Sequence, residues 1–188
     1  MRQLQPTRPA TPAVNPEGLL VARAAAGDEA AFEAIMREHN QLLFRTARSI
    51  LKNDQEAEDA VQDALIISWE KRHTLRQPQY FGTWLTRILI NCAKQRLRAQ
   101  RPNHELADTY PAPQEDTVEN LALKMALENL PLKDRIPLIL FHLDGYSVKE
   151  VSNILHLPQG TLKSRLARAR MKLKEALKVE EVLVHAQN

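Results

Sequence analysis

The segment GYSVKEVSNILHLPQGTLKSRLARARMKLKEAL, residues 145–177, constrains the fold more than any other part of the chain. Ser147 and Glu150 form the S-x-x-E arrangement, in which each residue caps the other at the start of a helix. Pro158 ends that helix, because a residue that precedes proline is pushed out of the helical region. The apolar residues of the helix that follows recur on one face: Leu162, Leu166, Ala169, Leu173 and Leu177. The segment therefore predicts a helix-turn-helix.

The second helix of this segment carries charges of almost one sign off its apolar face. They are Lys163, Arg165, Arg168, Arg170, Lys172, Lys174 and Lys178, opposed only by Glu175. Such a helix can enter a major groove, where its first turns contact base edges and its cations contact phosphates. The alternative is an ordinary amphipathic helix with solvated charges. DNA binding is favoured because the cations follow a capped helix and a turn. His156 stands where such turns often have glycine, and histidine tolerates positive φ.

Proline and charge divide the chain into two helical units. The first sixteen residues contain four of the eleven prolines, which is typical of a disordered arm. Another proline-rich stretch has acids but no Lys or Arg between Arg101 and Lys124. We therefore predict an all-α fold: two small helical domains joined by a flexible acidic linker, the second with the helix-turn-helix. The predicted boundaries are an arm at 1–18, a first domain at 19–101, a linker at 102–118, a second domain at 119–178 and a tail at 179–188.

Apolar periodicity places helices within each unit. Asp28 is a candidate N-cap for a helix that carries Phe32, and further apolar stripes cover residues 42–51 and 57–69. HTLRQPQYFG breaks the pattern, and a helix is predicted from Thr83 to about residue 100. The second unit is predicted to contain helices at 118–130, 133–144, 147–155 and 159–178. Pro137 should make the second of these start late or kink.

Several classes of function lack their signatures in this sequence. The five glycines are isolated, so no loop can cradle a phosphate, and the six histidines show no metal-ligand spacing. No nucleophile elbow is present, so an enzyme is disfavoured and neither cofactor nor metal is expected. No apolar run reaches 18 residues and no signal core begins the chain, which predicts a cytoplasmic protein without stable membrane insertion. Cys92, the single cysteine, is expected to be a small buried apolar residue.

The helix predicted from Thr83 has a second, polar face. Trp84, Arg87, Asn91, Lys94 and Arg98 recur on it at spacings of 3, 4, 3 and 4, and Tyr80 and Phe81 precede it. Aromatic rings, cations and an amide together suit single-stranded nucleic acid, because bases stack on rings and phosphates pair with cations. Equally, the rings could be core residues and the cations merely solvated.

The preceding segment NDQEAEDAVQDALIISWEKR has the opposite charge, with five acids between Asp54 and Asp63. An acidic surface is a poor neighbour for DNA and suits a basic protein partner. The alternative, an ordinary exposed helix face, stays open on this segment alone.

Three segments in order, DQEAEDAVQDALIISWEK, YFGTWLTRILINCAKQRLR and LPQGTLKSRLARARMKL, resemble the signatures of bacterial extracytoplasmic-function (ECF) sigma factors. The resemblance covers about residues 19–178. It implies a first domain that grips the RNA polymerase clamp and melts the −10 promoter element, and a second domain that reads the −35 element. It also implies that no enzyme activity is present.

The resemblance assigns roles to residues that match its motifs. The polymerase-binding set would be Asp59, Gln62, Asp63 and Trp69. The −10 set would be Tyr80, Phe81, Trp84, Arg87, Asn91, Lys94 and Arg98. The −35 set would be Thr161, Lys163, Ser164, Arg165, Ala167 and Arg168.

The implied partners are core RNA polymerase, promoter DNA and an anti-sigma factor, and the implied output is a stress- or signal-responsive gene set. Two other functions remain open from the residues. A conventional helix-turn-helix regulator would use only the C-terminal half, and an RNA-binding protein would share the stacking and cationic features. Initiation by core polymerase without another sigma factor distinguishes a sigma factor from the conventional regulator. Preference for a non-template DNA strand over RNA distinguishes it from the RNA-binding protein.

Overall fold

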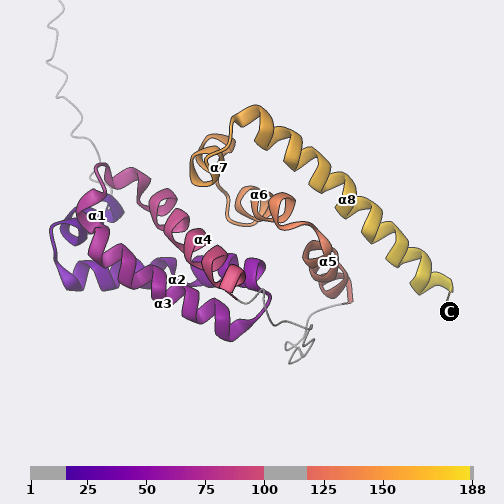
Figure 1. The fold of residues 1–188 in the computed structure, drawn as a ribbon, viewed down its shortest axis with the longest axis horizontal. Helices are drawn as coiled ribbons and strands as arrows, with labels where there is room; N and C mark the ends of the chain where they lie inside the picture. The colour runs from indigo at the N-terminus through magenta and orange to yellow at the C-terminus, as the bar shows by residue number, and fades with distance from the viewer. Residues whose placement is uncertain (1–15, 100–117, 187–188) are drawn as a thin grey trace, which may run out of the picture.

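The computed structural model describes residues 16–99 and 118–186, and every regular element in these ranges is a helix. The first half contains α1 (Pro16–Ala25), α2 (Glu29–Leu51), α3 (Asp54–Lys71), the short 3-10 helices η1 (Arg72–Thr74) and η2 (Pro78–Tyr80), and α4 (Phe81–Ala99). The second half contains α5 (Val118–Asn129), α6 (Leu132–His142), α7 (Val148–Leu155) and α8 (Gln159–Ala186). Figure 1 shows these two groups next to each other. The prediction of an all-α fold in two helical units is confirmed, and the predicted acidic linker lies outside the described residues except for Val118.

The apolar stripes predicted on either side of residues 37–41 lie on one continuous helix, α2, of 23 residues. Asp28 caps its start as predicted, and its side chain accepts a hydrogen bond from the Ala31 backbone N–H at 3.0 Å. The intervening REHNQ contains neither glycine nor proline, so nothing in the sequence breaks the helix. The length of α2 lets it pack against α1, α3 and α4.

The helix predicted from Thr83 begins two residues earlier, at Phe81, because η2 completes the break at Tyr80. Gly82 therefore lies inside α4 rather than in the break. Helices α1 to α4 bury their apolar faces against one another, and the fully buried side chains include Val21, Ile35, Leu43, Ile50, Leu85, Leu89 and Ile90. This packing fixes which side of α4 faces outward.

Helix α6 begins at Leu132 and runs through Pro137, so the predicted late start is wrong, and the alternative of a kink at Pro137 stays a prediction. Pro137 has no N–H to donate to the carbonyl of Lys133, four residues earlier, and Lys133 is an exposed residue. Pro137 itself is buried with the apolar residues around it. Burial of this face outweighs the missing backbone donor.

The predicted helix-turn-helix is present and consists of α7, the turn at residues 156–158 and α8. Ser147 and Glu150 make both hydrogen bonds of the capping box, at 2.8 and 3.3 Å. His156 adopts the left-handed conformation, with φ of 53°, and ends α7. Helix α8 continues beyond the predicted residue 178 to Ala186, through a sequence that contains neither glycine nor proline.

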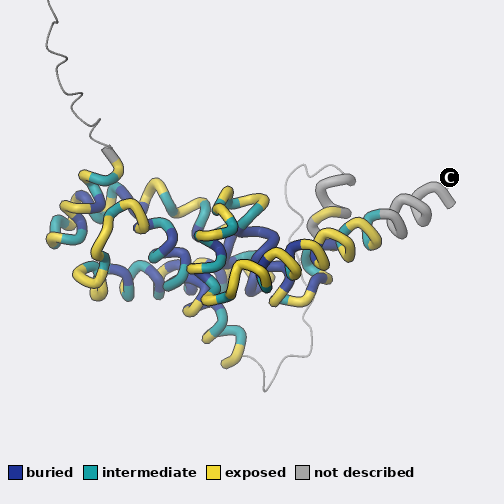
Figure 2. The backbone as a smooth tube through the Cα atoms, turned by 90° about the horizontal axis from the view of Figure 1, so that it is seen from above, coloured by how far each residue is buried: buried dark blue, intermediate teal, exposed yellow. Residues whose placement is uncertain are grey.

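The two halves pack against each other. Helix α6 contacts α2, and α7 contacts α4. The buried apolar residues of both halves form one continuous cluster. In Figure 2 the dark-blue residues occupy the middle of the molecule, while the described end of α8 extends beyond it.

Replacing Ser147 with alanine is expected to lower the free energy of unfolding by about 0.5–2 kcal/mol, because the first turn of α7 loses the side-chain acceptor for the Glu150 N–H. Urea denaturation followed by circular dichroism measures the change. Ser147→Thr is the matched control, since threonine keeps the hydroxyl and should retain most of the stability. An equal loss in both variants would contradict the capping role.

Candidate protein and nucleic-acid interfaces

Three carboxylates of α3 converge on one arginine of α4. Arg96 Nη1 lies 3.5 Å from Glu56 Oε2 and 3.1 Å from Asp59 Oδ2. Arg96 Nη2 lies 2.7 Å from Asp63 Oδ2, to which Arg96 Nε also donates a hydrogen bond at 2.8 Å. These four residues, the Arg96 cluster, hold two of the predicted polymerase-binding acids in place. Three negative charges face one positive charge, so the surface remains acidic.

A groove of about 340 Å³ lies beside the Arg96 cluster, between α3 and α4. It is lined by Asp63, Ile66, Ile67, Cys92, Gln95, Arg96 and Ala99. Ile66 is an exposed large apolar side chain, and Gln62, one turn earlier on α3, is also exposed. Apolar surface bordered by charge is the usual composition of a protein-binding site.

Cys92 is buried, as the sequence predicted. Burial raises the pKa of its thiol, and the negative charge of Asp63 raises it further. The thiol therefore stays protonated and Cys92 acts as a small core residue.

Trp69 lies two helical turns after Gln62 on the same side of α3, but unlike Gln62 it is partly covered. Its ring makes an edge contact with Phe32 of α2, with ring centroids 5.0 Å apart. The Arg72 guanidinium lies over the same ring at 4.1 Å from its centroid. Trp69 is thus half-buried and helps to hold α3 against α2.

The aromatic residues at the start of α4 differ in accessibility. Tyr80, on η2, is 47% exposed, whereas Phe81 is 3% exposed. Phe81 packs against His39 and Trp84, with ring centroids 5.3 and 5.9 Å away. Trp84 is half-buried. The ring of Tyr80 is therefore accessible, whereas the ring of Phe81 is packed against Trp84.

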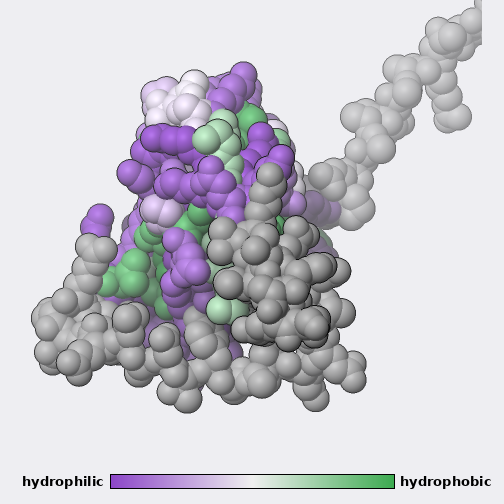
Figure 3. Space-filling view, turned by 90° about the vertical axis from the view of Figure 1, so that its right-hand side faces the viewer, coloured by the Kyte–Doolittle hydropathy of each residue, from purple (hydrophilic) through white to green (hydrophobic). Residues whose placement is uncertain are grey.

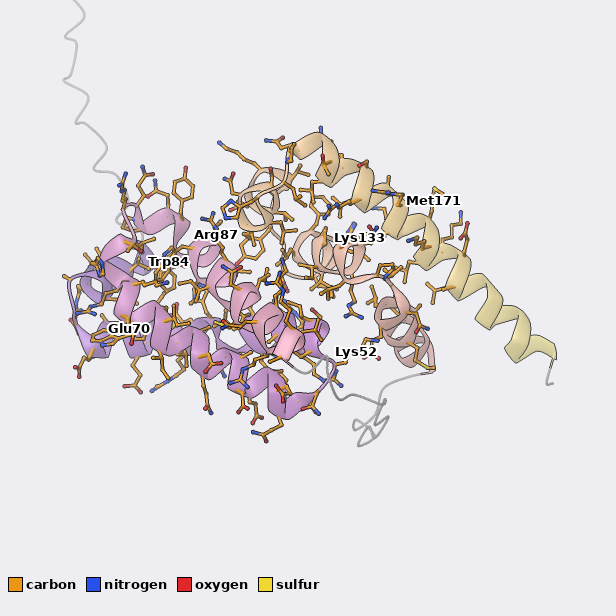
Figure 4. All side chains as sticks on the ribbon, in the orientation of Figure 1. Lys52, Glu70, Trp84, Arg87, Lys133 and Met171 are labelled. Atoms are coloured by element: carbon orange, nitrogen blue, oxygen red, sulfur yellow. The ribbon has the colours of Figure 1, made fainter. Side chains whose placement is uncertain are left out.

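The polar face of α4 is only partly open to solvent. Asn91 and Arg98 are exposed, and Arg87 and Lys94 are half-buried. Figure 4 shows Arg87 on the part of α4 nearest α7, where its Nη2 donates to the carbonyl of Asn153 at 2.9 Å. Burial lowers the pKa of Lys94, and the positive charges of Arg98 and Arg165 lower it further.

The outer face of α8 is open where the −35 contacts are predicted. Lys163, Ser164, Ala167 and Arg168 are exposed, and Thr161 and Arg165 are half-buried. Leu162, Leu166 and Ala169 are buried against α6 and α7. Short side chains between the cations allow close approach of a nucleic-acid backbone or base edge.

Later cations of α8 bind α6 instead. Arg170 Nε lies 3.1 Å from His142 Nε2, and Lys172 Nζ lies 3.1 Å from the buried carboxylate of Asp134. Burial lowers the pKa of His142, and Arg170 lowers it further. The predicted cationic run therefore divides into an outward-facing first part and a second part that fastens α8 to α6. Figure 3, which faces this end of the molecule, shows a described surface that is mainly hydrophilic.

Comparison with known proteins identifies the family. Residues 35–102 match the family described as Sigma-70 region 2, and residues 120–173 match Sigma-70, region 4. The ECF RNA polymerase sigma factor SigM of Mycobacterium tuberculosis is 35% identical over 162 residues, which cover 84% of this chain and 83% of that protein. The chain belongs to the ECF sigma factors of bacterial RNA polymerase. The sigma-E factor of Escherichia coli K12 is another relative; it is 33% identical over 172 residues, which cover 81% of this sigma factor and 89% of that protein.

Two solved structures resemble this sigma factor across both domains. One is CnrH in complex with the cytosolic domain of CnrY, with a TM-score of 0.69, 27% identity, and coverage of 87% of this chain and 97% of that chain. The other is the sigma factor RpoE in complex with the anti-sigma factor NepR from Bartonella quintana, with a TM-score of 0.69, 30% identity, and coverage of 79% and 97%.

Membership of this family decides between the functions that the residues left open. A sigma factor binds core RNA polymerase and directs it to promoter DNA, and it is not an enzyme. A conventional helix-turn-helix regulator would not explain the match to region 2. Among the described residues, no three candidate ligands gather at a metal-binding distance, and no helix combines the length and apolarity that a membrane span requires.

Proposed function

We propose that this sigma factor uses three separate surfaces, one for each step of promoter recognition. The acidic α3, with Asp59, Gln62 and Asp63, binds a basic part of the polymerase clamp. The segment from Tyr80 to Arg98 receives the unpaired −10 strand, and the start of α8 reads the −35 duplex. The observation that supports this division most strongly is the opposite charge of the outer faces of α3 and α8 within one chain.

The −10 step begins with Tyr80, the exposed ring at the entrance to α4. Removing a base from the stack costs a few kcal/mol, and stacking on an aromatic ring returns about 1–3 kcal/mol per base. Trp84 extends the platform, Phe81 supports it, and the cations Arg87, Lys94 and Arg98 follow the phosphates with Asn91 among them. Polymerase contacts must supply the remaining free energy, so the isolated chain should bind promoters weakly.

The −35 step uses Lys163, Ser164, Ala167 and Arg168 on the exposed face of α8, with Thr161 and Arg165 at its edge. The first turns of the second helix of a helix-turn-helix contact base edges in the major groove. We further propose that the protein acts in the cytoplasm, with domains at about 19–101 and 119–178. An anti-sigma factor is expected to hold it inactive, because the similar sigma factor RpoE of Bartonella quintana was solved in complex with the anti-sigma factor NepR.

The test of the proposed function is transcription with purified core polymerase. This chain alone should allow initiation at promoters found by mapping transcript starts after overexpression, and scrambling either element should abolish it. Failure at every mapped start would overturn the proposal.

Replacing Arg168 with alanine is expected to weaken promoter binding of the holoenzyme by about 1–3 kcal/mol if the guanidinium reads a base. The loss should then disappear on DNA with a scrambled −35 element. If Arg168 contacts only phosphate, the loss will be equal on both sequences and the salt dependence shallower. Lys174→Ala is the matched control, because Lys174 is an exposed cation farther along α8. Binding titrations at several salt concentrations make these measurements.

A further inference from the structure

The carboxylate of Asp144, just after α6, is enclosed by residues of α2 from the other domain. Asp144 Oδ1 accepts hydrogen bonds from Arg45 Nε at 3.1 Å and Arg45 Nη2 at 2.7 Å. Asp144 Oδ2 accepts one from the Thr46 hydroxyl at 2.7 Å, and Arg45 also donates to the Leu143 carbonyl. The Asp144 side chain is 0% exposed. A carboxylate buried this completely depends on its partners across the interface.

A second polar contact lies close to this one in sequence. The Tyr146 hydroxyl is 2.7 Å from the Thr86 hydroxyl and donates to the Gly82 carbonyl at 3.3 Å, and both partners belong to α4. A Cβ at Gly82 would lie 3.5 Å from the Tyr146 hydroxyl, which is an ordinary van der Waals contact, so the hydroxyl lies directly against this turn of α4. Burial raises the pKa of Tyr146. The hydroxyl therefore stays protonated and able to donate.

The same interface covers part of the face of α4 that is assigned to the −10 strand. Arg87 is bonded to the Asn153 carbonyl of α7, and its Nε is buried without a hydrogen-bond partner among the described residues. Lys94 is partly buried and lies near enough to Arg165 of α8 to be affected by its charge. Two residues assigned to the −10 strand thus lie beside the second domain, Arg87 against α7 and Lys94 near a cation of α8.

The promoter geometry is incompatible with this arrangement. The −10 and −35 elements lie about 25 base pairs apart, which is about 85 Å of duplex at about 3.4 Å per base pair. Here α4 and α7 are in contact, and Lys94 of α4 lies near Arg165 of α8. The two domains must separate before both elements can be bound.

We propose that Arg45, Thr46 and Asp144 form a latch that holds the free sigma factor closed and masks the −10 surface until polymerase binds. The masking of the −10 surface rests on the proposed function, whereas the closed form held by the latch does not. The closed form leaves Gln62 and Ile66 of α3 exposed, so polymerase can bind it. Promoter binding then follows opening. The latch is an intramolecular interface that competes with DNA.

The test compares Arg45→Ala with Arg37→Ala in the full-length chain. Arg45 lies on the surface of α2 and its hydrogen bonds go to Leu143 and Asp144 across the interface, so its loss should leave each domain folded. Arg37 is another exposed arginine of α2, paired within its own helix to Glu33. Donor and acceptor dyes on Asn40→Cys and Met171→Cys report the separation of the domains in single-molecule fluorescence transfer. Both positions are exposed, and the native Cys92 is buried.

The parent chain is expected to show mainly the short interdomain distance. Arg45→Ala should raise the open fraction at least roughly tenfold, because only the closed form then contains a buried carboxylate without its charge partner. Tyr146→Phe should raise it less, and Arg37→Ala should match the parent. A parent chain that is mainly open, or an open fraction unchanged in Arg45→Ala, would overturn the latch.

A second measurement separates the latch from the proposed function. Binding of a fluorescent single strand with the mapped −10 sequence should tighten in Arg45→Ala in proportion to the open fraction. If the distance increases and binding of the strand does not, the latch stands and the −10 assignment fails. If transcription depends on both promoter elements but the distance is unchanged, the function stands and the latch fails.

Discussion

Replacing Asp63 with lysine is expected to weaken binding of core RNA polymerase by about 30-fold or more, which corresponds to about 2 kcal/mol. Asp63 lies in the Arg96 cluster at the edge of the α3–α4 groove. A lysine there would face both Arg96 and the basic surface expected on the polymerase. Titration of labelled sigma factor with core enzyme measures the dissociation constant.

The control for this experiment is Glu38→Lys, which makes the same change of charge at an exposed position on α2. It should bind polymerase like the parent chain. Thermal unfolding of both variants shows whether loss of the Arg96 partner disturbs the domain. Equal weakening by both substitutions would mean that overall charge, rather than the α3 surface, determines binding.

Replacing Leu85 with alanine is expected to lower the free energy of unfolding by about 2–5 kcal/mol. Leu85 is 0% exposed and belongs to the inner face of α4. Its loss leaves a cavity beneath α4, the helix that carries most of the residues proposed to contact the −10 strand. Urea denaturation measures the loss, and initiation at a mapped promoter should fall most at temperatures near the lowered midpoint.

Leu19→Ala is the matched control for this substitution. Leu19 is 55% exposed on α1, so its truncation removes little buried surface and should cost less than about 1 kcal/mol. If both substitutions destabilised the protein equally, Leu85 would not be the core residue that its burial indicates.

Helices were predictable from the sequence where local signals are strong. Asp28, Ser147 with Glu150, and Pro158 each act through neighbouring backbone atoms, and each marks a helix end that the structure contains. Continuity was less predictable, because apolar stripes do not show whether a helix is interrupted between them, as in α2. The start of α6 before Pro137 was not predicted, because the free energy gained by burying α6 depends on the tertiary structure.

The outward face of α8 was also predictable, since its apolar and cationic residues separate at the helical period. The sequence did not show which of these cations remain exposed and which bind α6. Lys172 reaches Asp134, and Arg170 reaches His142, because α6 lies against α8. Similarly, the sequence could not distinguish the exposed ring of Tyr80 from the buried ring of its neighbour Phe81.

By itself the sequence determined an all-helical chain, its helix-turn-helix and the opposite charges of its two main surfaces, because capping and periodicity act over a few residues. Only the tertiary structure decided that Arg96 gathers three carboxylates and that Asp144 is buried against α2. These contacts join residues 33 to 99 positions apart. Their formation depends on how whole helices pack, which no local pattern contains.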